Sequence, residues 1–241
     1  MKEFKKLFEN VTGSRIYRNS LPHGTDCLLD LHKRFGRDNF KVVFDIGANI
    51  GQSAIEYVTA LPKAEIYSFE PVSSTYEELS SNVRSFSRVH PFKLGMGSAA
   101  GKATITVGDN SRTSSIVVAH NGGKLEEIDV DTVAGSAERH GIDLIDFMKI
   151  DTEGYDLQVL AGAEPLLERQ KINIVISECE PAAKTGNFVS FQNLVEYMSR
   201  YDYHFFGAYE QQPEWSGNNS VLYWNALFVA GKLVTAGAKL H

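Results

Sequence analysis

Cysteine and long apolar runs are both scarce in this sequence of 241 residues. Its two cysteines, Cys27 and Cys179, are far apart and form no CxxC pair, so they cannot by themselves make a structural zinc site. We expect two buried free thiols, which fits a reducing compartment. No stretch approaches the roughly 18 consecutive apolar residues of a membrane span. The start, MKEFKKLFEN, carries charges where a signal peptide has an apolar core. We therefore expect a cytoplasmic protein with no membrane span.

Basic residues are also in deficit. The chain has 24 Lys and Arg against 30 Asp and Glu, which gives a formal net charge of −6. A protein that binds nucleic acid normally carries a basic face that displaces counterions from the phosphates. This composition therefore predicts no nucleic-acid partner, and a small molecule or a carbohydrate is the expected one.

Apolar residues, by contrast, are plentiful. They make up 43% of the chain and charged residues only 22%, so the sequence can bury enough surface to offset its conformational entropy. The length suits one α/β domain over residues 1–241, and no convincing linker divides it. We expect a helical preamble over residues 1–40, with a helix over 25–35 that ends at Gly36.

Five short, almost continuously apolar runs alternate with helical patterns, which is typical of parallel strands covered by helices on both faces. The first two helices follow the first two strands, and Ser74 with Glu77 is a candidate capping box for the second. The pattern predicts a doubly wound α/β sheet. The expected strands cover residues 41–47, 64–70, 89–95, 144–151 and 172–178.

Two regions depart from this alternation. Residues 101–130 combine Gly, Asn and Ser clusters with β-branched segments, which predicts an inserted hairpin or lid. The tail has a helical pattern around Leu194 and then two aromatic and β-branched runs, which predict an antiparallel strand pair. Core packing is the favoured role of these tail aromatics, and a stacking surface for a sugar is the alternative. Trp215 is the exception, because it falls in a polar loop.

The carboxyl ends of the first two strands carry the residues expected to hold a cofactor, because ligands of open α/β sheets bind at that edge. The first strand ends in DIGANIGQS, a glycine turn that exposes backbone N–H donors at the start of a helix. The second ends in Glu70 and Pro71, where an acid can accept hydrogen bonds from both ribose hydroxyls. The predicted cofactor residues of the first turn are Asp45, Gly47, Ala48, Asn49, Gly51 and Ser53.

The spacing of this turn separates two nucleoside cofactors. A dinucleotide fingerprint has the pattern G-x-G-x-x-G, whereas here Asn49 stands where the middle glycine would be. The carboxylate of Asp45 would repel a pyrophosphate but suits a cation or an amino group. S-adenosylmethionine has both, and we favour it over NAD. A plain glycine turn with no cofactor is the third possibility.

Four segments together resemble the motif series of FkbM-type methyltransferases: VVFDIGANIGQSAIEY, IYSFEP, FMKIDTEGYDLQVLAGA and IVISECE. The resemblance covers roughly residues 21–230 and implies a class I, Rossmann-like methyltransferase fold with a mostly parallel seven-stranded sheet. It also implies S-adenosylmethionine as cofactor and S-adenosylhomocysteine as product. Related enzymes methylate hydroxyls of sugars, polyketides or other natural products. One departure is Thr132-Val133-Ala134, where the family often has T-L-D.

Further sites follow from this resemblance. Gly97 and Ser98 occupy the place where such folds meet the adenine, and Ser114 and Ser115 are weaker candidates for cofactor or acceptor contacts. His120 and His140 flank the insertion and its following helix and are candidate bases, although loop packing is the favoured role.

The predicted catalytic side chains are Asp151, Glu153 and Glu178, which follow the fourth and fifth strands. We expect Asp151 beside the sulfonium and Glu153 or Glu178 to bind the acceptor hydroxyl and take its proton. Two alternatives stay open: the glutamates cap neighbouring backbone N–H groups, or the three carboxylates hold Mg²⁺.

The predicted function is an S-adenosylmethionine-dependent O-methyltransferase acting on a sugar, glycan or natural-product hydroxyl. Its rivals are an NAD-dependent oxidoreductase or epimerase, and a catalytically silent domain that binds a nucleoside.

Overall fold

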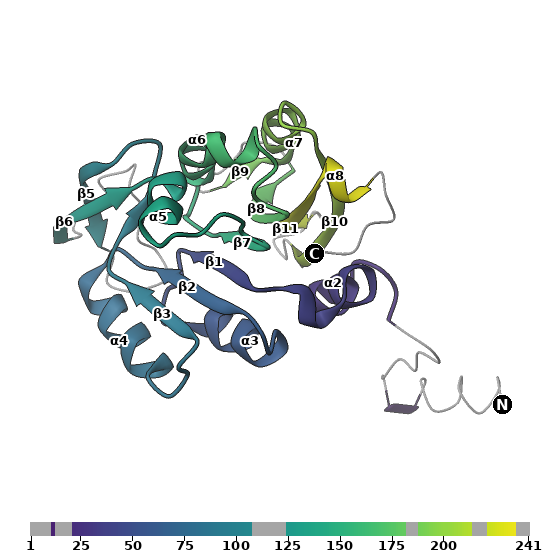
Figure 1. Cartoon of the computed structure of the whole chain (residues 1–241), viewed down its shortest axis with the longest axis horizontal. Helices are drawn as coiled ribbons and strands as arrows, with labels where there is room; N and C mark the ends of the chain where they lie inside the picture. The colour runs from purple at the N-terminus through teal and green to yellow at the C-terminus, as the bar shows by residue number, and fades with distance from the viewer. Residues whose placement is uncertain (1–10, 13–20, 108–123, 182–187, 214–220, 235–241) are drawn as a thin grey trace.

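The computed structural model describes residues 11–12, 21–107, 124–181, 188–213 and 221–234. Its main sheet has the order β10-β11-β8-β7-β1-β2-β3, and the two-residue strand β9, Val189–Ser190, pairs with β8 (Figure 1). Within the described residues no helix is long and apolar enough to cross a membrane. The strands of the main sheet span Val42–Ile46 (β1), Glu65–Phe69 (β2), Val89–Phe92 (β3), Phe147–Ile150 (β7), Ile174–Glu180 (β8), Tyr203–Pro213 (β10) and Val221–Ala230 (β11).

The sheet is parallel except for one strand. The pairs β1–β2, β1–β7, β2–β3 and β7–β8 are parallel, whereas β11 is antiparallel to both β8 and β10. The last strand thus lies between β8 and β10, which confirms the antiparallel pair predicted for the tail. Strands β1, β7 and β8 are buried at almost every residue, as the continuous apolar runs predict for a sheet covered on both faces.

Helices cover both faces of the sheet (Figure 1). On one face α2, Cys27–Phe35, α3, Gln52–Ala60, and α4, Ser73–Val83, share a core with β1 and β2. On the other face α5, Val133–Arg139, α6, Asp156–Leu167, and α7, Phe191–Ser199, pack against β7, β8 and β11. Two further short helical elements are η1, Arg37–Asn39, and α8, Gly231–Val234. The doubly wound architecture is therefore confirmed.

The helix ends show which local signals determine the fold. Helix α2 begins after Asp26, whose carboxylate accepts a hydrogen bond from Leu29 N, and ends at Gly36 with φ 83°, as expected. Helix α4 has no side-chain cap of its own, so the predicted Ser74–Glu77 capping box is wrong. Instead Glu126, distant in sequence, accepts a hydrogen bond of 2.9 Å from Ser73 N.

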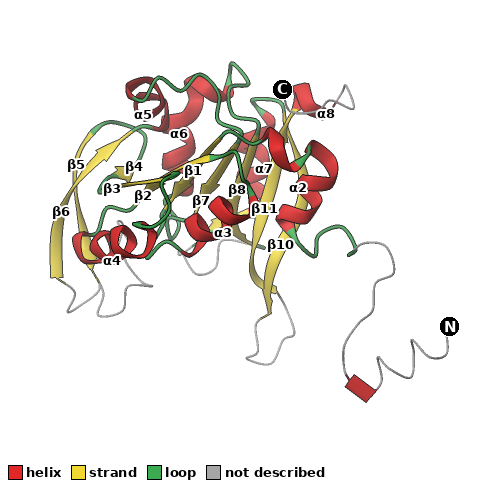
Figure 2. Ribbon diagram, turned by 60° about the horizontal axis from the view of Figure 1, so that its bottom comes forward, coloured by secondary structure: helices red, strands yellow, loops and turns green. Residues whose placement is uncertain are grey.

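The predicted insertion forms a second, three-stranded sheet. Strands β5, Gly101–Val107, and β6, Lys124–Asp131, pair antiparallel, and β4, Gly95–Met96, pairs parallel with β6. The hairpin is thereby confirmed, and it lies at the opposite end of the molecule from β10 and β11 (Figure 2). Residues 108–123, with Ser114, Ser115 and His120, lie outside the described residues, as does Trp215.

One expected strand is wrong in extent. The sequence predicts a single strand over 89–95, but β3 ends at Phe92 and Gly95–Met96 belongs to the second sheet. The chain turns there because Leu94 N donates a hydrogen bond of 3.2 Å to the carbonyl oxygen of Glu70, across the end of β2. This turn brings β4 beside the carboxyl edge of the main sheet.

Helix α6 approaches the backbone after β4 so closely that only glycine fits. A Cβ atom on Gly162 would overlap the carbonyl oxygen of Gly97 and lie 3.2 Å from Thr132 Cβ. We therefore expect Gly162→Ala to lower the free energy of unfolding by about 1–3 kcal/mol, as overpacking of a core does. Urea denaturation measures this. Gln158→Ala, at an exposed position of α6, is the control, and equal stability of the two variants would contradict the close approach.

Candidate active site

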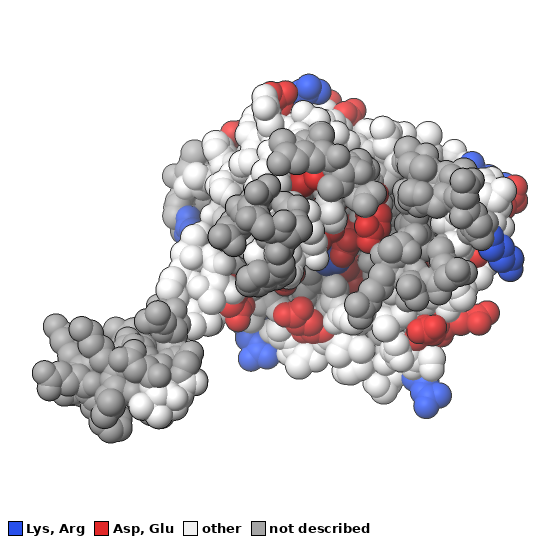
Figure 3. Space-filling model, turned by 180° about the vertical axis from the view of Figure 1, so that it is seen from behind, with Lys and Arg blue, Asp and Glu red and all other residues white. Residues whose placement is uncertain are grey.

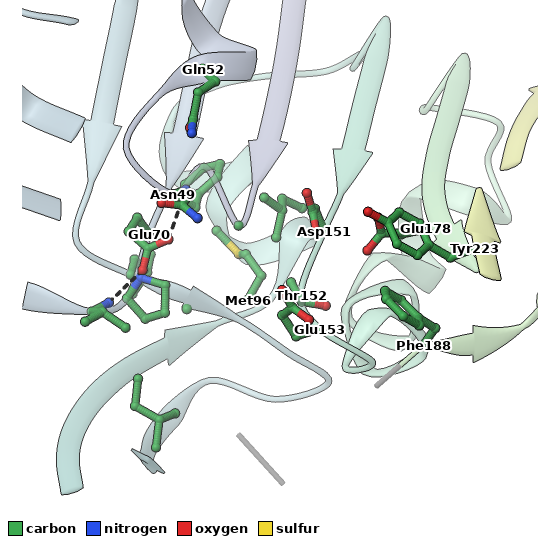
Figure 4. Close-up of a pocket in the computed structure, with 18 residues that line it drawn as sticks. Asn49, Gln52, Glu70, Met96, Asp151, Thr152, Glu153, Glu178, Phe188 and Tyr223 are labelled. Carbon is green, nitrogen blue, oxygen red and sulfur yellow. Dashed lines mark hydrogen bonds between the residues drawn. The ribbon is translucent and has the colours of Figure 1, made fainter. Parts of the chain in front are cut away.

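A cavity of about 410 Å³ opens at the carboxyl edge of the main sheet (Figure 4). Segments that follow β1, β2, β7 and β8 form its walls, together with β4 and β11. Several predicted site residues meet there although they are far apart in sequence. The lining consists of Ile46, Gly47, Asn49, Gln52, Phe69, Glu70, Pro71, Val72, Leu94, Gly95, Met96, Ile105, Asp151, Thr152, Glu153, Glu178, Phe188 and Tyr223.

The glycine turn after β1 is held tightly against the neighbouring strands. The N–H groups of Gly47 and Ala48 each donate a hydrogen bond of 3.0 Å to the carbonyl oxygen of Phe69. Gly47 has φ 76°, and a Cβ atom there would overlap the carbonyl oxygen of Asp151. Glycine is thus required both by the left-handed backbone and by the close approach of the loop after β7.

Glu70 lies at one end of the cavity with both carboxylate oxygens fixed. Oε2 accepts a hydrogen bond of 3.1 Å from Asn49 N, and Oε1 accepts one of 3.0 Å from Val72 N (Figure 4). Burial raises the pKa of Glu70 to about 7, against the lowering effect of these two N–H donors. Each oxygen keeps a lone pair that can accept from a ligand hydroxyl.

Asp45 is fully buried behind this turn and is absent from the cavity wall. Neither of its oxygens accepts a hydrogen bond of good geometry within the described residues. Burial raises its pKa to about 6, and the Lys149 ammonium, opposite it in the β1–β7 pairing, acts in the lowering direction. The predicted direct contact between Asp45 and a cofactor therefore stays a prediction, and its charge lies behind the wall.

Lys149 is the ionic residue that the sequence reasoning missed. Its Nζ lies 2.7 Å from Asp151 Oδ2, and only 9% of the residue is exposed. Burial lowers the pKa of Lys149, but the carboxylates of Asp151 and Asp45 outweigh it and raise the pKa to about 12. A signal was present in the sequence, because a lysine inside the apolar strand FMKI needs a buried partner.

Three carboxylates occupy the middle of the cavity and the side nearest β8 (Figure 4). Burial, followed by the charge of Asp151, raises the pKa of Glu153 to about 7 and that of Glu178 to about 8. Glu153 has φ 53°, a left-handed conformation uncommon for a glutamate. Asp151 N donates to the carbonyl oxygen of Ile46 at 3.0 Å, which fixes the loop beside the glycine turn.

The two alternatives for these carboxylates find little support. The described residues supply no capping hydrogen bond to Glu153 or Glu178, and α6 begins without a side-chain cap. Asp156, in the first turn of α6, accepts hydrogen bonds from the hydroxyls of Thr152 and Ser177. Among the described residues, no three His, Cys, Asp or Glu side chains converge as metal ligands.

Aromatic rings form the wall on the β11 side. Phe188 and Tyr223 stack with centroids 4.8 Å apart and ring planes inclined by 25° (Figure 4). Burial and then the charges of Glu178 and Asp151 raise the pKa of the Tyr223 hydroxyl. Tyr203 and Tyr209 are buried in the core, as favoured from the sequence, so Tyr223 is the tail aromatic brought to the cavity within the described residues.

Other predicted residues lie off the cavity wall. Gly97 packs against α6, and His140 packs against Phe92 with ring centroids 4.8 Å apart and ring planes inclined by 53°. Gly95 and Met96 line the cavity where Gly97 and Ser98 were expected, because the chain reaches the wall through β4. The predicted cofactor residues that the cavity lining lacks are Asp45, Ala48, Gly51, Ser53, Gly97 and Ser98.

The chain is similar in sequence to named methyltransferases. The chain is 28% identical over 173 residues to "Methyltransferase sdnD" of Sordaria araneosa, and the match covers 58% of this chain and 67% of that protein. It is 30% identical over 140 residues to "Hexuronic acid methyltransferase AglP" of Haloferax volcanii, covering 57% of this chain but only 55% of that protein. Among solved structures, M. capricolum TrmK with S-adenosylhomocysteine superposes with a TM-score of 0.47 at 15% identity, covering 84% of this chain and 66% of that one.

The sheet order, with one antiparallel strand and helices on both faces, is that of the class I methyltransferase fold. The family description "Methyltransferase FkbM domain" matches residues 45–205, which hold the glycine turn, Glu70 and all three carboxylates. This protein is a methyltransferase that belongs to the FkbM methyltransferase domain family.

Proposed function

We propose that the protein transfers a methyl group from S-adenosylmethionine to a hydroxyl oxygen of a sugar, glycan or natural-product scaffold. The observation that carries this proposal is one cavity with two chemically different ends. Glu70 and the glycine turn form one end, Glu178 and the aromatic pair form the other, and Asp151 lies between them (Figure 4). Such an arrangement suits two ligands that meet at Asp151.

The residues of the first end fit this cofactor. Glu70 keeps lone pairs for the two ribose hydroxyls, and Gly47 lets the loop that carries Asp151 approach the glycine turn closely. Asp151, with Asp45 behind the wall, supplies negative charge that attracts a sulfonium or an amino group. When bound, S-adenosylmethionine supplies a methyl group on a positively charged sulfur.

The second end fits the acceptor hydroxyl. In the transfer, the acceptor oxygen forms a bond to the methyl carbon as the carbon–sulfur bond breaks, and the hydroxyl proton leaves. Glu153 or Glu178 takes that proton, since a carboxylate with a pKa of about 7 or 8 is matched to proton transfer near neutral pH. Asp151 orients the reacting groups and balances the charge between them.

Cofactor binding tests this proposal first. We expect Glu70→Gln to weaken S-adenosylmethionine binding by about 10- to 100-fold, because hydrogen bonds to a charged acceptor are replaced by bonds to a neutral amide. Isothermal titration calorimetry measures the change. Glu78→Gln, an exposed position of α4, is the matched control and should bind like the wild type.

Thermal-shift measurements separate the rivals. Stabilisation by S-adenosylmethionine and S-adenosylhomocysteine supports the proposal, whereas stabilisation by NAD alone would favour an oxidoreductase or epimerase. Binding of S-adenosylmethionine with no turnover over a broad panel of hydroxylated acceptors would favour a silent domain.

A further inference from the structure

The charged residues of the described cavity wall are all acidic. Four of the residues that line it are acids, Glu70, Asp151, Glu153 and Glu178, and none of the lining residues that the structure describes is Lys, Arg or His. Figure 3 shows Asp and Glu side chains gathered in a hollow of this face. A bound anion would therefore meet several like charges and no side-chain cation in the described part of the wall.

The nearest buried cation is already used. Lys149 lies off the cavity wall, and its ammonium is paired at 2.7 Å with Asp151 and faces Asp45 from the opposite strand position. Because the single positive charge of Lys149 lies between two carboxylates, no net positive charge is left to attract a third anionic group. Within the described residues, an anionic acceptor would gain a buried cation only by displacing one of these partners.

The acceptor end also offers a flat apolar surface. Phe188 and Tyr223 stack on each other at the cavity wall, and the hydroxyl of Tyr223 lies within the field of Glu178 and Asp151. Aromatic side chains can pack against the C–H face of an acceptor ring, while carboxylates at the edge of that ring accept hydrogen bonds from its hydroxyls. This combination fits a ring that bears several hydroxyls.

We propose that the acceptor is an uncharged polyhydroxylated ring, and that Asp151, Glu153 and Glu178 exclude acceptors that carry a carboxylate, sulfate or phosphate. This inference rests on the proposed function and specifies its substrate. It separates this protein from the hexuronic acid methyltransferase that it resembles over 57% of its chain, because a hexuronic acid is an anion.

Matched sugar pairs test the proposal. Saturation-transfer NMR with the S-adenosylhomocysteine-loaded protein compares methyl glucoside with methyl glucuronoside, and methyl galactoside with methyl galacturonoside. Labelled methyl transfer then gives kcat/KM for each member that reacts. The buffer is held at pH 9, above the values to which the pKa of Glu153 and that of Glu178 are raised, about 7 and about 8.

We expect the neutral member of a pair to bind, and to react, at least 100-fold better than the acid. A preference for the acid, equal use of both, or no binding by any of the four sugars would overturn the inference. The titration of the wild-type protein with S-adenosylmethionine is an independent test. If the wild-type protein does not bind S-adenosylmethionine, the proposed function is overturned. If it binds S-adenosylmethionine but prefers the acidic sugar, only the acceptor class is overturned.

A pair of variants isolates the role of charge. Tyr223→Lys places a cation beside Glu178, and Tyr223→Met removes the ring at similar length without adding charge. The preference for the neutral sugar is the ratio of its kcat/KM to that of the acidic sugar. We expect this ratio to fall at least tenfold further in Tyr223→Lys than in Tyr223→Met. An equal change in both variants would mean that ring packing, and not charge, sets the selectivity.

Discussion

Asp151→Asn is expected to lower turnover at least 100-fold while the fold stays intact, because asparagine keeps the shape of the side chain but removes its charge from the centre of the cavity. The backbone bond from residue 151 N to the carbonyl oxygen of Ile46 does not depend on the side chain, so the loop should hold its place. Steady-state methyl-transfer assays at saturating S-adenosylmethionine measure kcat, and circular dichroism reports the fold.

Two controls make this result specific. Asp129→Asn, at an exposed position of β6, removes the same charge from a residue that does not line the cavity and should leave turnover unchanged. Calorimetry with S-adenosylhomocysteine, which lacks the sulfonium charge, should show a smaller loss of affinity than S-adenosylmethionine. Near wild-type turnover of Asp151→Asn would remove this carboxylate from the reaction.

The end of the cavity that holds the glycine turn and Glu70 was predictable because its residues follow strands of a parallel sheet. The carboxyl ends of such strands meet at one edge, so Gly47, Glu70 and Asp151 had to lie near one another once the strands were recognised. No knowledge of register was needed for this step. The predicted residues that line the cavity follow β1, β2 and β7 directly, or, for Glu178, lie near the end of β8.

The aromatic end of the cavity was not predictable in the same way, because pairing between strands that are distant in sequence builds it. Tyr223 reaches the cavity only because β11 lies antiparallel beside β8, where Asn225 is opposite Glu178. A one-residue change in that register would point the ring to the other face of the sheet. The cap of α4 shows the same limit, because Glu126 replaces the local box that the sequence predicts.

The largest expected effect on stability comes from Lys149→Met. Methionine keeps most of the volume of the side chain, but it leaves Asp45 buried without a cation and Asp151 without its partner at 2.7 Å. Breaking a buried pair in this way is expected to cost about 3–5 kcal/mol of unfolding free energy at pH 8. Urea denaturation measures this loss. Lys63→Met, at an exposed position, should change stability by no more than about 0.5 kcal/mol.

The pH dependence of that loss identifies its cause. The pKa of Asp45 in the folded protein, about 6, is raised above its ordinary value of 3.8, so its buried charge destabilises the fold progressively as pH rises through this window. Without Lys149 the pKa rises further, and the difference between variant and wild type should be small near pH 5 and full at pH 8. Adding Asp45→Asn should restore part of the stability at pH 8. A loss that is equal at both pH values, with no rescue, would instead indicate a packing defect.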